Sequence, residues 1–270
     1  MLEALFTPRH RALPMVMWHA AMLEAEGPPA FKVYLWAGAQ GVHQASTTCA
    51  ELLERLGCAR AWERIQAVLR PTDVIAFVGL DLVPDEEARV KVYLNHAAPL
   101  SAREYERAAS LAPDSVPGDA TTFLHLLRGE EAPSAPPKLT FHATRQVMTS
   151  YRIVPGKAGD IDSVALQFPY ALCSPGGPSA PERTRALLRA HGLPTEDYAR
   201  CLEVFASPGA TGFSGANSYI SFQRARGRPV VTPYFTSRLF AERFGLLTRD
   251  WDMIRAWHFP PRAPQEPHHG

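Results

Sequence analysis

The chain has 270 residues, of which 46% are hydrophobic and 20% charged, and its formal net charge is +1. These values indicate a globular protein with a sizeable core, and they exclude a disordered chain or an overall basic field that attracts nucleic acid or membranes. No apolar run approaches the ~18 residues of a membrane span. The four cysteines lack CxxC spacing and no signal peptide is visible, which predicts reduced core thiols in a cytoplasmic protein. They are Cys49, Cys58, Cys173 and Cys201.

The first predicted elements are two β-rich runs, residues 14–22 and 31–36, around the turn Gly27-Pro28-Pro29, which indicates a hairpin. Two helical patterns follow at 46–57 and 60–70. The same order of hairpin, helix and helix recurs, and the four repeats occupy about 14–70, 73–128, 145–206 and 217–257. The remaining strands are expected at 73–82, 90–95, 146–154, 164–169, 217–223 and 231–236. The remaining helices are expected at 101–112, 119–128, 180–191, 195–206, 236–246 and 248–256.

The repeats are also visible in the letters of their second strands. FKVYLW (31–36) matches VKVYLN (90–95) almost residue for residue, and VALQFP (164–169) and VTPYFT (231–236) are weaker echoes. Aligned on one position, these strands place Tyr34, Tyr93, Gln167 and Tyr234 in equivalent places. The connector GEEAPSAPPK (129–138) interrupts neither this pattern nor its period, so a single domain of residues 1–270 is predicted.

The strands alternate between an aliphatic and a polar face, because successive strand side chains point to opposite sides. The aliphatic set, which includes Phe31, Val33 and Leu35, needs cover, and the amphipathic helices supply it. The other set is too polar for a dry core and too aromatic for an ordinary surface. It comprises Lys32, Tyr34, Trp36, Arg89, Lys91, Tyr93, Asn95, Ser163, Ala165, Gln167, Tyr219, Ser221, Gln223, Thr232 and Tyr234. We therefore predict an α+β fold: an antiparallel β-barrel or curled sheet of about eight strands, with a polar lumen and paired helices outside.

The lumen residues suit an anion beside a carbocation. Lysine and arginine bind phosphate oxygens, and arginine does so with two parallel hydrogen bonds. Aromatic faces stabilise a cation by ~2 kcal/mol or more when water is excluded. Pyrophosphate and an allyl cation are the two fragments of an ionised isoprenyl diphosphate, so this donor class fits the pattern.

Three segments resemble the aromatic prenyltransferases of the dimethylallyltryptophan synthase type, which have the ABBA barrel. They are AFKVYLW (30–36), DLVPDEEARVKVYLN (81–95) and SYISFQRARGRPVVTPYF (218–235), and the resemblance extends over about 13–240. It implies transfer of a dimethylallyl group to an electron-rich ring, commonly indole, without obligatory Mg²⁺ or another cofactor. It also implies that Lys32, Arg89 and Lys91 clamp the diphosphate and that Tyr34, Tyr93 and Tyr234 shield the cation, with Trp36 and Gln167 as further substrate contacts.

The chain departs from this family in three ways. Relatives have five strand–helix repeats and the sequence indicates four, so the first repeat, with the glutamate that binds the indole N–H, has no counterpart. Gln167 stands where relatives often have tyrosine. Pro14 and Pro233 interrupt the first and last strands, and prolines belong on sheet edges. These departures leave open an active short form or a degenerate barrel that binds a diphosphate or another small ligand without catalysis.

Several residues keep a second interpretation. Arg89 and Lys91 could lie on a solvated strand face, and the tyrosines and Trp36 could be packing residues. His19, expected on the lumen face, is a candidate acceptor for the ring proton because its pKa lies near neutrality, but an exposed histidine is the simpler interpretation. Asp81 suits a turn cap, and Arg152 receives no role.

The expected partners are dimethylallyl diphosphate and an aromatic small molecule, with neither nucleic acid nor membrane. A homodimer is a further alternative. The surroundings of His10 and His142 lack metal-ligand spacing, so no structural metal is predicted.

Overall fold

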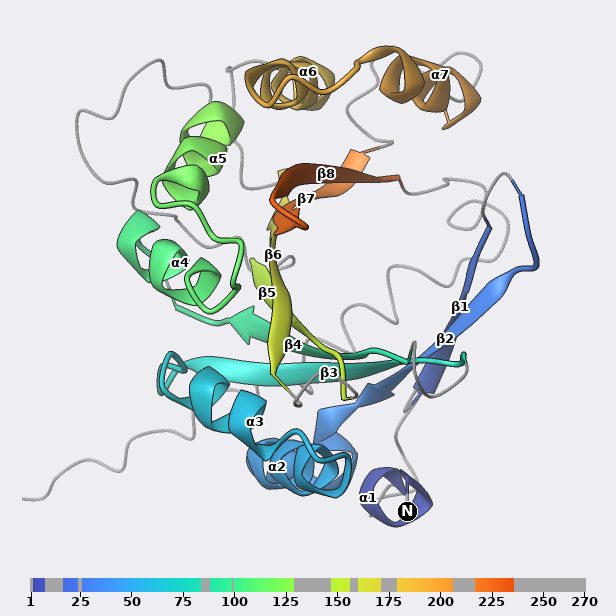
Figure 1. Cartoon of the computed structure of the whole chain (residues 1–270), viewed down its shortest axis with the longest axis vertical. Coiled ribbons are helices and arrows are strands. Elements are labelled where there is room, and N and C mark those ends of the chain that lie inside the picture. The colour runs from blue at the N-terminus through green and yellow to red at the C-terminus, as the bar shows by residue number, and fades with distance from the viewer. Residues whose placement is uncertain are drawn as a thin grey trace, which may run out of the picture. The chain divides into compact units, whose positions relative to one another are not determined.

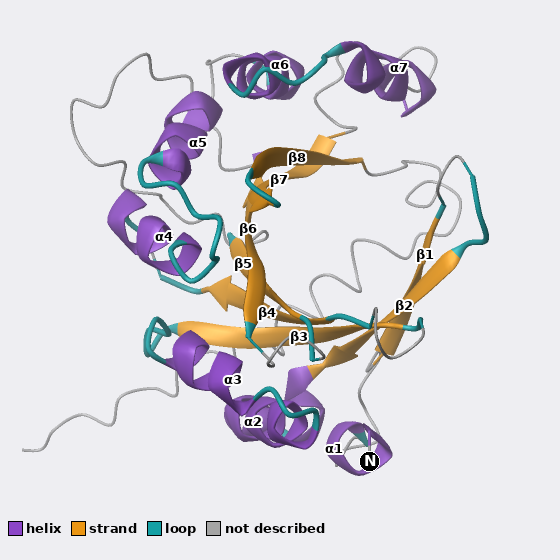
Figure 2. Cartoon of the chain, viewed as in Figure 1, coloured by secondary structure: helices purple, strands orange, loops and turns teal. Residues whose placement is uncertain are grey.

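The structure is a computed structural model, and its described residues fall within 1–236 (Figures 1 and 2). They are residues 2–7, 17–23, 26–83, 88–98, 100–128, 147–155, 160–170, 179–205 and 217–235. The predicted helices at 236–246 and 248–256 and Cys173 lie outside them, and the prediction of a single domain over 1–270 stays a prediction.

One antiparallel sheet of eight strands runs through the described part of the chain, in the spatial order β1 to β8. Each strand pairs with its neighbours in sequence, so the four predicted hairpins are present and lie side by side. The strands are β1 (Met17–Met22), β2 (Ala30–Trp36), β3 (Asp73–Asp81), β4 (Val90–His96), β5 (Met148–Ile153), β6 (Ile161–Pro169), β7 (Asn217–Ala225) and β8 (Arg228–Phe235).

Helices follow each of the first three hairpins, as predicted. They are α2 (Ala45–Arg55), α3 (Ala59–Gln66), α4 (Ala102–Ala109), α5 (Asp119–Arg128), α6 (Ala180–Ala190) and α7 (Glu196–Phe205). The capping box predicted at Ser101 is present: its hydroxyl accepts from the Glu104 amide, and Glu104 accepts from the Ser101 amide. Three short helices have no counterpart in the sequence prediction: α1 (Leu2–Phe6), η1 (Ala37–Gln40) and η2 (Val42–Gln44).

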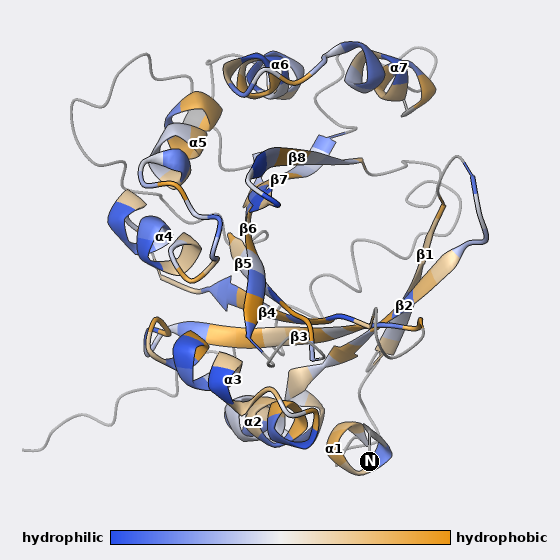
Figure 3. Cartoon of the chain, in the orientation of Figure 1, coloured by the Kyte–Doolittle hydropathy of each residue, from blue (hydrophilic) through white to orange (hydrophobic). Residues whose placement is uncertain are grey.

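The sheet is curled, and the helices α2 to α7 lie along its outer side (Figure 1). Figure 3 shows both hydrophilic and hydrophobic residues on α2 to α5, as expected for helices that cover a sheet with one face. The outward-facing strand residues are buried beneath them and join the helix residues in one core. That core includes Val33, Leu35, Leu52, Trp62, Ile65, Val78, Val92, Leu94, Tyr105, Phe123, Leu127, Tyr151, Ile153, Leu166, Leu187 and Phe222.

Two predictions about the core need correction. Phe31, expected beneath a helix, is 48% exposed, because it lies at the hairpin end of β2, beyond the residues that η1 and α2 cover. Cys49 and Cys58 are buried free thiols as predicted, whereas Cys201 is free but exposed on α7.

The predicted fold class is confirmed, with one qualification about closure. Among the described residues β1 and β8 each pair on one side only, so the sheet forms a curled open wall there and not a closed ring. Pro229 and Pro233 both lie in β8, which pairs only with β7, in agreement with the expectation that prolines occupy sheet edges.

A polar network lies on the outer side of the sheet, between β3, β4 and β5. The His96 ring contacts Asp73 at 3.0 Å and Thr149 at 2.8 Å, and Asp73 also accepts from the Arg70 guanidinium at 2.9 Å. Burial would raise the pKa of Asp73, but hydrogen bonds from His96 and Arg70 outweigh it and hold the pKa below 3.8. These buried polar groups are therefore paired with one another, as a packed core requires.

Candidate active site

The concave face of the sheet collects the predicted site residues through its register. Lys32 lies opposite Asp81, Tyr34 opposite Gly79, and Gly79 opposite Lys91. Lys91 in turn lies opposite Arg152 on β5. Because directly opposed residues point to the same side of a sheet, these side chains form one continuous row across β2, β3, β4 and β5.

Four cations occur in this part of the face: Lys32, Arg89, Lys91 and Arg152. The Lys32 ammonium lies 3.2 Å from Oδ1 of Asp81, and the Arg89 guanidinium donates to the other oxygen of the same carboxylate. The guanidinium of Arg152 contacts Asp162. Three of the four cations therefore have a carboxylate beside them.

Lys91 is the exception. Within the described part of the chain its ammonium has neither an ion pair nor a hydrogen bond. Burial lowers the pKa of Lys91 to about 8, and the neighbouring charges of Lys32, Arg152 and Arg89 add to this effect. At neutral pH Lys91 is therefore a largely protonated, poorly solvated cation. An anion that enters the site can pair with its ammonium group without displacing a carboxylate.

The predicted tyrosine pair lies next to the cations. The rings of Tyr34 and Tyr93 are 5.8 Å apart at an interplanar angle of 61°, and Gly79 lies between them on β3. A Cβ at Gly79 would lie 3.2 Å from the Tyr34 ring and 3.4 Å from that of Tyr93, so glycine permits this close approach. Burial raises the pKa of both phenols, which keeps them neutral at pH 7 and leaves their ring faces available to a cation.

Trp18 and Phe77 extend this aromatic surface, and sequence reasoning missed both. Trp18 stacks on Tyr34 with ring centroids 5.9 Å apart, and its ring meets that of Phe77 edge-on at 4.2 Å. Trp18 faces inward because its register partner is Tyr34. The prediction placed the other face of β1 inward.

His19 is the correction that follows. Its register partner is Val33, a core residue on the outer side of the sheet, so His19 points away from Tyr34 and is exposed. The expectation that it faces the lumen was wrong by one residue, and a one-residue slip moves a strand side chain to the opposite face. In this arrangement His19 does not reach a reacting ring on the concave face.

The two remaining predicted substrate contacts, Trp36 and Gln167, also lie on the concave face. Trp36 lies opposite Phe77, is buried, and rests over Gly38, where a Cβ would lie 2.6 Å from its ring. Gln167 is buried on β6 and donates from Nε2 to the Ser150 hydroxyl at 3.2 Å.

Tyr234 lies on β8, the far end of the sheet from Tyr34. It nevertheless contributes to the raised pKa values of Tyr34 and Tyr93. The register places Tyr234 opposite Tyr219, on the same concave face of the sheet as Gln167. A tyrosine shield shared with Tyr34 and Tyr93 stays a prediction.

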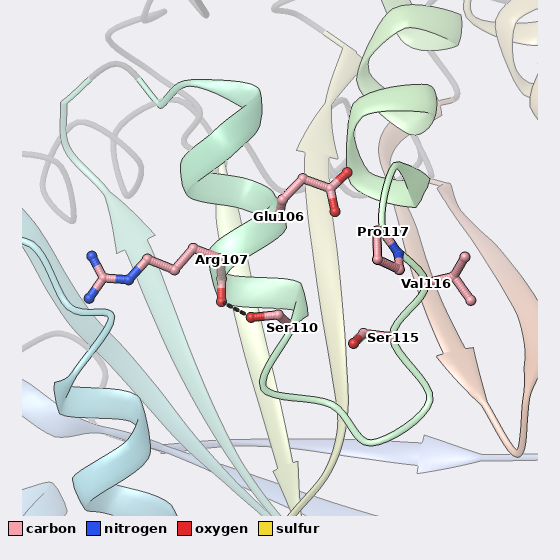
Figure 4. A pocket seen from close by; sticks show the side chains of 6 residues that line it. All are labelled: Glu106, Arg107, Ser110, Ser115, Val116 and Pro117. Atoms are coloured by element: carbon pink, nitrogen blue, oxygen red, sulfur yellow. Dashed lines mark hydrogen bonds between the residues drawn. The ribbon is translucent and has the colours of Figure 1, made fainter.

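A second hollow of about 270 Å³ lies on the outer side, between α4 and the turn that leads to α5 (Figure 4). Its polar groups already have structural partners: Glu106 accepts from the Thr121 amide at 2.9 Å, and Arg107 donates to the Ala67 carbonyl. Residues 115–117 complete its wall. It offers no convergent polar groups for chemistry.

The described residues contain neither a metal-site cluster nor a membrane-spanning helix. No group of three or more His, Cys, Asp or Glu side chains is placed there to hold a metal ion. None of the helices in the described ranges is long and apolar enough to cross a membrane.

The curled antiparallel sheet with helices along its outer side has the ABBA architecture that the sequence predicted. No model of a known protein family matches the chain. Solved structures do. It superposes on 6-dimethylallyltryptophan synthase from Micromonospora olivasterospora, in complex with DMASPP and Trp, with a TM-score of 0.75 and 23% identity.

Two further structures are more similar in sequence. The prenyltransferase PriB, in complex with L-tryptophan and dimethylallyl thiolodiphosphate, is 28% identical with a TM-score of 0.69. The 5-dimethylallyltryptophan synthase of Streptomyces coelicolor, in complex with DMASPP and Trp, is 27% identical with a TM-score of 0.71. The matches cover 88% of this chain but 64% to 66% of the other chains, so it spans just under two thirds of their length. They confirm the predicted resemblance.

Proposed function

We propose that the chain is an aromatic prenyltransferase that moves a dimethylallyl group from dimethylallyl diphosphate to an aromatic acceptor, an indole or a tryptophan derivative. The observation that carries this proposal is the order of residues along β4. Arg89, Lys91 and Tyr93 lie on one face at steps of two residues, about 6.7 Å each. A cation site and an aromatic site therefore lie next to each other on one face of the strand.

The concave face supplies what the donor needs to ionise. Lys91 and its cationic neighbours hold the diphosphate, so the C1–O bond breaks with its electron pair on the leaving oxygen. Tyr34 and Tyr93, with Trp18 beside them, present ring faces to the allyl cation. A carbon of the acceptor ring then bonds to C1, and the ring restores its aromaticity by losing a proton to an oxygen of the released diphosphate or to water.

The acceptor is supported by the relatives. Three of the matched structures hold tryptophan together with a dimethylallyl diphosphate analogue. In this chain we assign Trp36 and Gln167 to contacts with the acceptor. Tyr34, Tyr93 and Tyr234 keep their role around the cation, and the register withdraws His19 from it.

We expect no obligatory Mg²⁺ and no other cofactor, because four basic side chains are present to neutralise the leaving diphosphate. The partners are then the two small molecules, with neither nucleic acid nor membrane, in a cytoplasmic protein. A homodimer stays an alternative.

A second candidate function is binding of a diphosphate without transfer. One observation favours it: no described carboxylate or histidine lies at the tyrosine end of the face to accept the ring proton. Asp81 and Asp162, the carboxylates described beside the cations of this face, are engaged by Lys32, Arg89 and Arg152.

The test is a thermal shift with dimethylallyl thiolodiphosphate, a donor analogue that ionises poorly, followed by an assay for pyrophosphate release with the donor and an indole. At 100 times its Kd the analogue stabilises the protein by ~2.7 kcal/mol. We expect this shift in the wild type and its loss in Arg89→Ala/Lys91→Ala. A shift without product supports the binding-only function, and no shift in the wild type contradicts both.

A further inference from the structure

A carboxylate lies in the middle of the cation cluster. Asp81 ends β3, between the two strands that carry the Lys-x-Tyr motifs, and its side chain is only 4% exposed. One oxygen contacts the Lys32 ammonium on β2 at 3.2 Å, and the other accepts from Arg89, which precedes β4. Its side chain thus joins a cation on β2 to a cation just before β4.

This position is unusual for an anion site. A buried negative charge repels a diphosphate, and it competes with the diphosphate for the same two cations. With Arg152 and its partner Asp162 included, the cluster holds four positive and two negative charges. Without Asp81 the excess of positive charge would be larger and the grip on a diphosphate stronger.

We infer that Asp81 is a positioning residue that limits how tightly the site retains diphosphate. Its carboxylate holds Lys32 and Arg89 in place while the site is empty, leaves Lys91 as the unpaired cation, and repels the anion enough to permit its release after reaction. The identity of the anion rests on the proposed function; the charge arrangement does not.

The charge of Asp81 also influences the protonation of Lys91. The charged groups that face Lys91 are Lys32 on β2, Asp81 on β3, Arg89 on the approach to β4 and Arg152 on β5, and Asp81 is the one that favours its protonated form. Removing the negative charge must therefore shift Lys91 toward its neutral form, and the pH above which diphosphate binding weakens must fall.

Asp81→Asn tests this, because asparagine keeps the shape and one acceptor while it removes the charge. Binding of inorganic pyrophosphate is measured by calorimetry at pH 6.5, where Lys91 is protonated. We expect about tenfold tighter binding in Asp81→Asn. The matched control is Asp160→Asn, which removes the same charge from an outer-side pair with Arg64 and should leave pyrophosphate affinity unchanged.

Two further readouts separate positioning from a structural role. In steady state, Asp81→Asn should lower KM for the donor and kcat together, because product diphosphate leaves more slowly. The pH midpoint of pyrophosphate binding should move below that of the wild type, and Asp81→Glu should restore both. If Asp81 had only a structural role, Asp81→Asn would lower the stability of the protein and would not change the pH midpoint of pyrophosphate binding.

Unchanged or weaker pyrophosphate binding in folded Asp81→Asn overturns the inference and leaves the proposed transferase intact. If Asp81→Asn melts below the assay temperature, Asp81→Ser replaces it with the same expected tightening. Tight pyrophosphate binding without any prenyl transfer overturns the proposed function and leaves the inference standing. A wild type that does not bind pyrophosphate at millimolar concentration overturns both.

Discussion

The polar network on the outer face of the sheet and Lys91 on its concave face differ in how their polar atoms are paired. On the outer face Asp73, His96 and Thr149 are buried and bonded to one another. On the concave face the Lys91 ammonium, on β4, has no hydrogen-bond or ion-pair partner among the described residues. Polar groups that are hydrogen-bonded within the core contribute to the stability of the fold. An unpaired polar group that is partly removed from water lowers stability, but it is available to bind a ligand. Substitutions on the two faces should therefore separate stability from binding.

The largest effect is expected on the outer face. Asp73→Ala leaves His96 and Arg70 without their buried carboxylate, which should lower the free energy of unfolding by about 3–5 kcal/mol. Donor-analogue affinity should stay within twofold of the wild type, measured at a temperature where the variant is folded. Denaturant melts give the first quantity. The exposed pair partner Asp197 is the control, and its alanine variant should change stability by less than ~0.5 kcal/mol.

The same carboxylate predicts acid sensitivity. The folded-state pKa of Asp73 is below its ordinary value of 3.8, so its contribution to stability is complete above that pH and is lost as the pH falls through the lower folded value. The stability difference between wild type and Asp73→Asn should therefore shrink as the pH falls below about 3.8. A difference that stays constant down to pH 2 would contradict the assignment.

On the concave face, Lys91→Met should weaken binding of dimethylallyl thiolodiphosphate by about 100-fold, or ~2.7 kcal/mol, the range of a charge-assisted hydrogen bond. The free protein should become more stable, because the variant removes a partly buried charge that has no ion-pair partner among the described residues. Chemical denaturation with and without the analogue measures both. If Lys91→Met lowers stability and binding together, the residue is a packing element and the contrast between the faces fails.

A smaller effect follows from pH. With a pKa of about 8, Lys91 is protonated at pH 7 and about nine-tenths neutral one unit above its pKa. Because its folded pKa lies below the ordinary value of 10.5, stability should rise between pH 8 and 10.5 as this group loses its proton. Analogue affinity should fall about tenfold between pH 7 and 9. Neither trend should survive in Lys91→Met.

The smallest expected effect concerns Gly79. Alanine there adds a Cβ 3.2 Å from the Tyr34 ring, so the ring must move by a few tenths of an ångström. We expect a three- to tenfold loss in kcat with little change in donor affinity, because the diphosphate contacts are untouched while the cation shield is displaced. Single-turnover rates would reveal it. An unchanged rate would mean that the Tyr34–Tyr93 spacing is not critical.

Alternation along the strands was sufficient to predict the eight strands and the face on which Lys32, Arg89, Lys91 and Tyr93 lie. Helical periodicity predicted the helices of the first three repeats. Alternation failed at β1, where Trp18 and not His19 faces inward, because alanines and methionines on both faces of that strand leave its register ambiguous. Asp81 and Arg152 were visible as residues, but their place in the cation cluster depends on pairings between strands. Those pairings are a tertiary property that a single strand does not display.

The two prolines of β8 affect whether a strand of another molecule can pair with this edge of the sheet. Pro229 and Pro233 are four residues apart, so both missing N–H groups belong to the same side of the strand, and proline is tolerated where that side faces away from a neighbour. An edge without these donors cannot complete a regular ladder with an added strand. Within the described residues, the β8 edge thereby discourages end-to-end growth into fibres.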